Sequence, residues 1–164
     1  MCDILNAIIA AGGTTAYQVP FSPETLRAMY IDAPSLVACH VAEADQLLGF
    51  QALWWPTDAA HPFPSGWTYI ATFARRGITQ RGVGSALFTA TRAAAEAAGS
   101  SVIDATIRAD NTGGLAYYAR QGFVDYERLV AVPLNDGTPV DRIRKRFDLQ
   151  VPVLSSGSSR SAYQ

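Results

Sequence analysis

The sequence predicts an α/β domain in which strands and helices follow one another along the chain. Two apolar, β-prone segments, 67–73 and 101–108, are each followed by a turn and then by a helical segment. The first turn is rich in glycine, and the helix after it is rich in alanine. A strand that leads through such a turn into a helix makes a site suited to an anion.

Two helices are predicted near the start of the chain. Residues 4–11 are apolar and are followed by Gly12 and Gly13, which favours a helix that ends there. Ser22 has the side chain of a helix cap, and Pro23 suits the first helical position. A second helix is therefore expected to begin at this point.

A hairpin and a loop are predicted next. Segments 35–42 and 46–55 are apolar runs separated by acidic turn residues at 43–45, a pattern typical of two antiparallel strands. Residues 56–64 contain three prolines, which favour a loop.

The helix after the glycine turn is the clearest element of the second half. It is expected to end at Gly99. Segments 123–134 and 141–151, on either side of a turn signal at 135–137, predict two final strands. The expected buried stripe of the helix is Val83, Leu87, Ala90, Ala94 and Ala97.

The glycine-rich turn is the first candidate site. Gly82 and Gly84 have no Cβ, so a ligand can approach the backbone closely. The free N–H groups and the positive dipole at a helix start suit a phosphate or pyrophosphate. Arg75, Arg76 and Arg81 add positive charge. A plain strand-to-helix connection with solvent-facing arginines would fit the same residues.

A second motif follows the strand at 101–108. Asn111 precedes Tyr118 by seven residues, and Tyr118 precedes the pair Gly122 and Phe123 by four. The turn motif and this second motif occur in a fixed order, which is hard to obtain by chance.

Together the two motifs resemble those of the GNAT superfamily of acyl-CoA-dependent N-acyltransferases. The pyrophosphate loop of that family is matched by Arg81, Gly84 and Ala86. The resemblance covers residues 66–130 and is closest to the branch of phosphinothricin and amino-acid N-acetyltransferases.

The resemblance implies a mixed, mostly antiparallel twisted sheet with about four flanking helices. Two neighbouring parallel strands in the centre, here 69–75 and 102–108, should splay apart and hold the cofactor. Residues 1–150 should form one such domain, followed by a serine-rich tail at 151–164. The strand that normally begins the family fold is expected to be missing.

Acetyl-CoA is the implied cosubstrate. Its extended arm should pair with the backbone of Phe73, Ala74 and Arg75, as an added strand would. Asn111 should contact the arm, cap the following helix, or do both. The loop residues expected to bind the cofactor are Arg81, Gly82, Val83, Gly84, Ser85 and Ala86.

The resemblance assigns Tyr118 as the general acid that protonates the leaving thiolate, since a phenol holds its proton at neutral pH. The alternative is a core aromatic, and Tyr117 is expected to be the core residue of the two. Many relatives carry a glutamate as base on the strand before the glycine turn, but residues 67–74 contain no carboxylate. The list of remaining candidates for the base is Asp104, His40, Glu43 and a chain of water molecules.

The acceptor should be the primary amine of a small molecule, an amino acid or an amino-acid analogue. Residues 12–17, Trp54, Trp55 and the proline-rich loop are expected to form aromatic walls with few charges. The alternative function is a non-catalytic acyl-CoA-binding sensor or interaction module. A P-loop hydrolase is excluded because no Gly-Lys-Ser/Thr follows the glycines, and a Rossmann dehydrogenase because Leu87 replaces its third glycine.

Composition narrows the partners further. The 164 residues are 49% hydrophobic and 16% charged, with a formal net charge of -1. Lys145 is the only lysine, and no basic run suggests nucleic acid. Cys2 and Cys39 form no metal-binding cluster, and no apolar run is long enough for a membrane helix. We expect a cytoplasmic protein without a metal, and a homodimer is left open.

Overall fold

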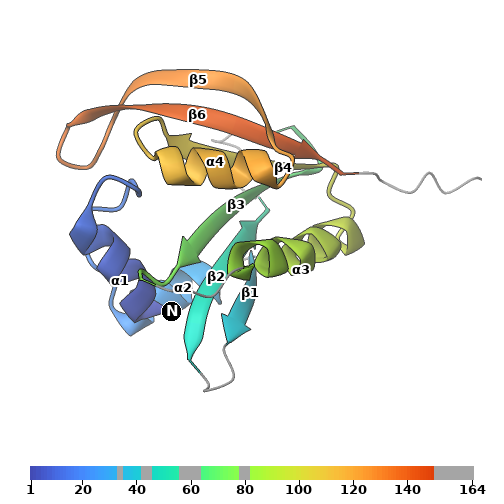
Figure 1. The fold of residues 1–164 in the computed structure, drawn as a ribbon, viewed down its shortest axis with the longest axis horizontal. Coiled ribbons are helices and arrows are strands. Elements are labelled where there is room, and N and C mark those ends of the chain that lie inside the picture. Colours follow the sequence, from blue (N-terminus) through green and yellow to red (C-terminus); the bar gives the residue numbers. More distant parts are fainter. Residues whose placement is uncertain (33–34, 42–45, 56–63, 78–81, 150–164) are drawn as a thin grey trace, which may run out of the picture.

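A computed structural model of the protein describes residues 1–32, 35–41, 46–55, 64–77 and 82–149 (Figure 1). The described residues form four helices and six strands, and the resemblance had implied about four helices.

Helices and strands are grouped along the chain rather than strictly alternating. In order, the elements are α1 (Cys2–Ala11), α2 (Pro23–Tyr30), β1 (Ser35–Val41), β2 (Leu47–Trp54), β3 (Trp67–Ala74), α3 (Val83–Ala97), β4 (Val102–Arg108), α4 (Thr112–Arg120), β5 (Val124–Pro133) and β6 (Pro139–Asp148). The predicted serine-rich tail, most of the proline-rich loop and the turn of the first hairpin lie outside the described residues.

The six strands form one mixed sheet in the order β1-β2-β3-β4-β6-β5. The central pair β3 and β4 is parallel, and the other four neighbouring pairs are antiparallel. This confirms the mixed, mostly antiparallel sheet. The first described element is a helix.

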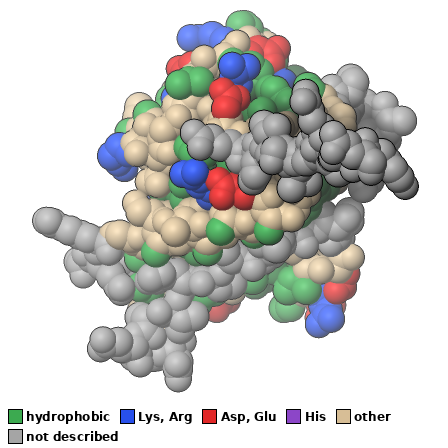
Figure 2. Space-filling view, turned by 90° about the vertical axis from the view of Figure 1, so that its right-hand side faces the viewer, with side chains coloured by type: hydrophobic (Ala, Val, Ile, Leu, Met, Phe, Trp, Pro, Cys, Tyr) green, Lys and Arg blue, Asp and Glu red, His purple; other side chains and the backbone are tan. Residues whose placement is uncertain are grey.

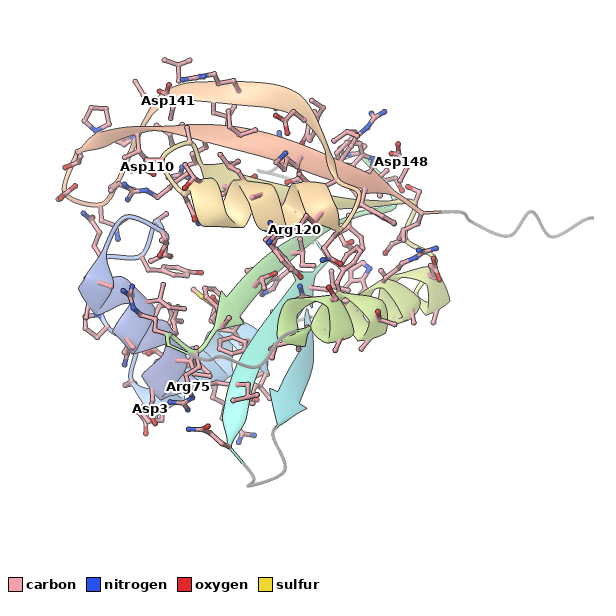
Figure 3. All side chains as sticks on the ribbon, in the orientation of Figure 1. Asp3, Arg75, Asp110, Arg120, Asp141 and Asp148 are labelled. Atoms are coloured by element: carbon pink, nitrogen blue, oxygen red, sulfur yellow. The ribbon has the colours of Figure 1, made fainter. Side chains whose placement is uncertain are left out.

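The parallel contact at the centre of the sheet is short. β3 and β4 pair only from Trp67 opposite Val102 to Tyr69 opposite Asp104. β3 continues along β2 as far as Ala74, while β4 continues along β6 to its end. The two halves of the sheet therefore diverge into a fork, and Figure 3 shows Arg75 and Asp110, which follow the two strands, far apart. The predicted splay is confirmed.

Helices cover both faces of the sheet (Figure 1). On one face α3 and α4 pack on a core that includes Phe88, Ile103 and Phe123. On the other face α1 and α2 pack on Phe50 and Phe73. Because successive strand residues point to opposite faces, each strand of the fork contributes side chains to both layers.

The buried stripe of α3 differs from the predicted one. The buried positions are Val83, Leu87, Phe88, Thr91 and Ala95. The exposed or half-buried positions include Ala90, Ala94 and Ala97, which the prediction had placed in the core. The helix turns the larger Phe88 and Thr91 toward the sheet, because they fill more of the core than alanine does.

Helix α4 begins with a capped and anchored turn. The Asn111 side-chain oxygen accepts a hydrogen bond of 2.9 Å from the Gly114 N–H, and its amide donates at 3.0 Å to the Thr14 carbonyl. At the end of β4, Arg108 donates to the Thr15 carbonyl at 3.3 Å. The segment between α1 and α2 is thereby held beside the open end of the fork.

The last two strands form a hairpin that arches over α4 (Figure 1). The predicted turn is present, with Gly137 at a φ of 85° and Leu134 N–H bonded to Thr138 O. Lys145 on β6 is 6% exposed and forms an ion pair with Asp125 on β5. None of the described helices has the length and apolarity that a membrane crossing requires.

Removal of the α4 cap should lower stability. We expect Asn111→Ala to reduce the free energy of unfolding by about 1 kcal/mol, because the Gly114 N–H loses its acceptor. Asn111→Asp keeps an acceptor at this position but removes the donor to Thr14, and should cost less. Urea unfolding of both variants tests this, and an Ala variant as stable as the wild type would show that the cap contributes nothing.

Candidate active site

The exposed edge of β3 inside the fork is the first part of the site. The Arg75 N–H donates to Leu48 O at 2.8 Å, so the backbone of Arg75 faces β2. Hydrogen-bonding direction alternates along an antiparallel strand, which also turns Phe73 toward β2 and turns Thr72 and Ala74 toward the gap. Of the three positions predicted to pair with the cofactor arm, only Ala74 has its backbone groups on that side.

The glycine turn leads directly into α3. Gly82 caps the helix with a φ of 86°, a left-handed conformation that favours glycine. The first three helical residues, Val83, Gly84 and Ser85, precede any intrahelical acceptor for their N–H groups, and the Ala86 N–H already donates to Gly82 O. The first turn of α3 contains no acidic residue, which suits an anion. Arg81 lies outside the described residues.

Gly84 is required for close packing rather than for an unusual backbone angle. A Cβ at this position would lie 2.6 Å from Cε2 of Tyr117. The Tyr117 hydroxyl also donates to the Gly84 carbonyl at 2.9 Å. Gly84 does not have a positive φ, and its lack of a side chain instead lets α4 approach the start of α3.

A buried polar network extends from this contact to the fork. Gln51 Nε2 donates to the Tyr117 hydroxyl and to Thr72 Oγ1, both at 2.8 Å. Thr72 Oγ1 shares a further hydrogen bond of 2.8 Å with the Tyr118 hydroxyl. Gln51 is fully buried, and among the described residues its Oε1 has no hydrogen-bond partner. This oxygen therefore has an unused capacity to accept a hydrogen bond.

The burial of the two tyrosines is the reverse of the expected order. Tyr118 is 6% exposed and belongs to the core under α4, whereas Tyr117 is half-buried. Burial raises the pKa of Tyr118, and the hydrogen bond with Thr72 opposes this in part. Burial likewise raises the pKa of Tyr117 to about 12. Both phenols therefore hold their protons at neutral pH.

Asp104 is the only predicted base candidate whose side chain lies at the fork within the described residues. His40 is on β1, which β2 separates from β3. Glu43 lies outside the described residues. Asp104 is fully buried and accepts a hydrogen bond of 2.6 Å from the Tyr126 hydroxyl.

Two further residues of this cluster, Tyr126 and Arg144, were not predicted from the sequence. Arg144 Nη2 lies 3.4 Å from Asp104 Oδ2, and its guanidinium stacks 5.1 Å from the centre of the Tyr126 ring. Both residues come from the final hairpin, and only the strand order β4-β6-β5 brings them to Asp104. The sequence held no signal for this contact.

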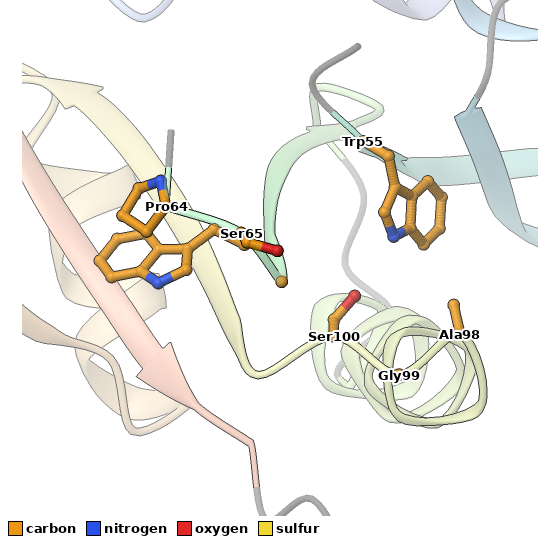
Figure 4. A pocket seen from close by; sticks show the side chains of 8 residues that line it. Trp55, Pro64, Ser65, Ala98, Gly99 and Ser100 are labelled. Carbon is orange, nitrogen blue, oxygen red and sulfur yellow. The ribbon is translucent and has the colours of Figure 1, made fainter. Parts of the chain in front are cut away.

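The predicted acceptor walls are only partly brought together. Trp54 packs with α2, where its indole donates to Met29 O at 3.3 Å. Trp55 packs on the opposite core and lines a pocket of about 200 Å³ with Trp67 and Ser100 (Figure 4). The two tryptophans therefore do not share one wall. The segment at residues 12–17 is held beside the fork by the contacts of Asn111 and Arg108.

The described surface and side chains suggest no other class of ligand site. On the face shown in Figure 2, basic and acidic side chains are interspersed. No group of three or more His, Cys, Asp or Glu residues within the described ranges is placed to hold a metal ion.

The family of the chain follows from its sequence and from this geometry. A sequence model of the acetyltransferase (GNAT) family matches residues 9–123, more than half of the chain. The chain belongs to the GNAT family. No curated protein matches this GNAT sequence significantly.

Solved structures share the GNAT fold at low sequence identity. An N-acetyltransferase from Staphylococcus aureus is 18% identical with a TM-score of 0.76, covering 91% of this chain and 90% of its own. A phosphinothricin acetyltransferase from Sinorhizobium meliloti, solved with acetyl-CoA, is 16% identical with a TM-score of 0.75, covering 90% and 80%. A ribosomal-protein-alanine N-acetyltransferase from Brucella melitensis is 20% identical with a TM-score of 0.72, covering 90% and 91%.

The chain is therefore an acetyltransferase of the GNAT family, and the structure from Sinorhizobium meliloti that shares its fold was solved with acetyl-CoA. The residues present fit this cosubstrate. The inner edge of β3 beyond Tyr69 has no strand partner among the described residues, and α3 begins without an acidic side chain. The backbone groups of the β3 edge match the amides of coenzyme A. The free N–H groups at the start of α3 match its phosphates.

Gly84→Val should weaken acetyl-CoA binding by at least about tenfold, since the added Cβ displaces Tyr117 and disturbs the start of α3. Calorimetric titration with acetyl-CoA measures the loss, and circular dichroism checks the fold. Ala90→Val, an exposed change on the same helix, is the control and should bind normally. Unchanged affinity of the Gly84 variant would exclude this turn as the phosphate site.

Proposed function

We propose that the protein transfers the acetyl group of acetyl-CoA to the primary amine of a small molecule, an amino acid or an amino-acid analogue. The amine attacks the thioester directly while both substrates are bound. The observation that carries the proposal is the fork, where the Tyr118 hydroxyl shares a hydrogen bond with Thr72 on β3.

The fork supports binding of the cofactor arm between β3 and β4. An arm that starts at the α3 N-terminus and pairs with Ala74 and Thr72 runs toward Tyr69, where the strands meet. Strand residues advance by about 3.3 Å each, so the arm follows β3 for several residues before it reaches the closed end of the fork. The thioester then lies near the Tyr118 hydroxyl.

Tyr118 serves as the general acid in this proposal. Its phenol keeps its proton because burial raises its pKa. The thiolate that leaves beside it is desolvated by the same walls, which raises the basicity of the sulfur as well. Proton transfer from Tyr118 to the thiolate therefore does not require a strongly acidic phenol.

A small acceptor fits the surroundings of the fork. The segment at residues 12–17 is held against the ends of β4 and α4, which narrows the approach from the face of α1 and α2. The ring of Tyr17, which belongs to this segment, packs edge to face with the ring of Phe21, and their centroids are 5.0 Å apart. The resemblance to phosphinothricin and amino-acid N-acetyltransferases favours the same class of acceptor.

Tyr118→Phe tests the assignment of the acid. The ring and its packing remain, so acetyl-CoA should bind almost normally, while kcat should fall by roughly 10² to 10⁴, the usual contribution of general acid–base catalysis. Rates of thiol release from acetyl-CoA, measured with a panel of amino acids, their analogues and polyamines, provide the readout.

Tyr117→Phe is the matched control for this change. Its hydroxyl donates to the Gly84 carbonyl and accepts from Gln51, so the variant should bind acetyl-CoA less tightly and keep kcat close to the wild-type value. A Tyr118→Phe enzyme with normal turnover would remove the acid assignment, and would leave solvent as the proton donor or a non-catalytic acyl-CoA-binding role.

Arg81 is proposed to contact the pyrophosphate. Arg81→Ala should weaken the binding of acetyl-CoA more than the binding of a short acetyl-pantetheine thioester, which lacks the nucleotide. The reason is that only acetyl-CoA carries the phosphates that Arg81 would contact. Competition binding with the two thioesters measures the difference. Equal losses for both would place Arg81 away from the phosphates.

A further inference from the structure

Asp104 occupies the point at which the fork closes. It is the last residue of β4 that pairs with β3, opposite Tyr69. Its side chain is fully buried. The next residue on the same face of β4, Thr106, lies beyond the pairing and is exposed. Thr106 therefore lies between Asp104 and the open end of the fork on this face.

The carboxylate of Asp104 is held from three directions. Oδ1 accepts the Tyr126 hydroxyl at 2.6 Å, and Oδ2 accepts the Thr106 hydroxyl at 3.3 Å and lies 3.4 Å from Arg144 Nη2. An ionised carboxylate offers about four acceptor positions. These three contacts fix its orientation and leave it able to accept one more hydrogen bond.

The carboxylate and the proposed acid lie on opposite faces of the fork. Tyr118 reaches β3 through Thr72, on the face covered by α3 and α4. Asp104 lies two residues from Thr106 and four from Arg108, and Arg108 contacts the segment between α1 and α2. The two groups are close enough for the charge of Asp104 to raise the pKa of Tyr118.

The charges around Asp104 are shared among several groups. Arg144 lies 3.4 Å from Asp104 and also pairs with Glu127 at 2.8 Å. Arg146, which lies opposite Asp104 on β6, pairs with Asp148 at 3.5 Å. An ammonium group can pair with the carboxylate of Asp104, whereas a second carboxylate would be repelled by it.

We propose that Asp104 binds the ammonium group of the acceptor and receives its proton, with Tyr126 and Arg144 as the residues that position the carboxylate. The inference rests on the proposed acetyl transfer and supplies the base that the strand before the glycine turn lacks. It commits to an acceptor that carries a primary ammonium group at the end that enters the fork.

The proton balance is as follows in this assignment. The ammonium gives one proton to Asp104, and the neutral nitrogen forms a bond to the acetyl carbon as the carbon–sulfur bond breaks. Tyr118 gives its proton to the sulfur and regains one from the new amide nitrogen through the fork. Asp104 releases its proton to solvent, so one ammonium and one thioester become one amide, one thiol and one proton.

Asp104→Asn is the first test. We expect kcat/KM for the amine to fall by roughly 10² to 10⁴ while acetyl-CoA binding stays within about twofold. Amine binding to the enzyme loaded with free CoA, which cannot transfer acetyl, should weaken at least tenfold in calorimetry. Asp148→Asn removes the same charge from an exposed position on β6 and should change neither value.

Tyr126→Phe is the second test, because it keeps the carboxylate even if Asp104→Asn does not fold. Burial raises the pKa of Asp104, and the hydrogen bond from Tyr126 and the charge of Arg144 lower it. The other ionisable groups around it include Tyr69, Glu127 and Tyr118. Arg146 lies opposite Asp104 on β6, and Arg108 lies four residues further along the same face of β4. Removal of the Tyr126 hydroxyl should raise the pKa of Asp104, so the acid limb of kcat/KM should move to higher pH.

The outcomes separate the two proposals. If the wild type binds acetyl-CoA but acetylates no amine of the panel, the proposed function fails, and this inference with it. If the wild type is active and a folded Asp104→Asn enzyme keeps its kcat/KM and amine binding, only this inference is overturned. An acid limb that stays in place in Tyr126→Phe also contradicts it.

Discussion

The short parallel contact between β3 and β4 is the constraint on which the rest of the structure depends. Three residue pairs hold the strands together, and beyond Tyr69 and Asp104 each strand follows a different antiparallel neighbour. Backbone groups inside a protein must find partners, so a fork of this kind is stable when a ligand can complete it. The tyrosines of α4 and the tethered segment at residues 12–17 border this opening from the two faces.

The network around Gln51 connects the two ends of the cofactor site. The Gln51 amide nitrogen donates to the Tyr117 hydroxyl, which contacts Gly84, and to Thr72, which shares a hydrogen bond with Tyr118. A change in the position of Tyr117 therefore reaches the proposed acid through a single buried side chain. The proposed phosphate site and the proposed acid share one rigid unit, since a fully buried glutamine has few alternative arrangements.

Local patterns predicted the elements and the turns that border the fork. The glycine turn, the cap at Asn111 and the turn at Gly137 each depend on neighbouring residues, so they can be recognised in the sequence. The tyrosine pair was harder, because adjacent helix positions point in different directions and only the packing of α4 decides which is buried. The contact of Asp104 with Tyr126 and Arg144 depends on strand order and register, which no local pattern encodes.

The ion pair between Lys145 and Asp125 has a chemical consequence for an enzyme of this class. A thioester can acylate any accessible unprotonated amine without a catalyst, and lysine side chains on a protein that holds acetyl-CoA are the nearest targets. The chain has one lysine, and that residue is buried and bound to a carboxylate, which holds its nitrogen out of reach. Where other proteins would present lysine, this surface presents arginine, so the enzyme offers its own reagent no ε-amine to modify.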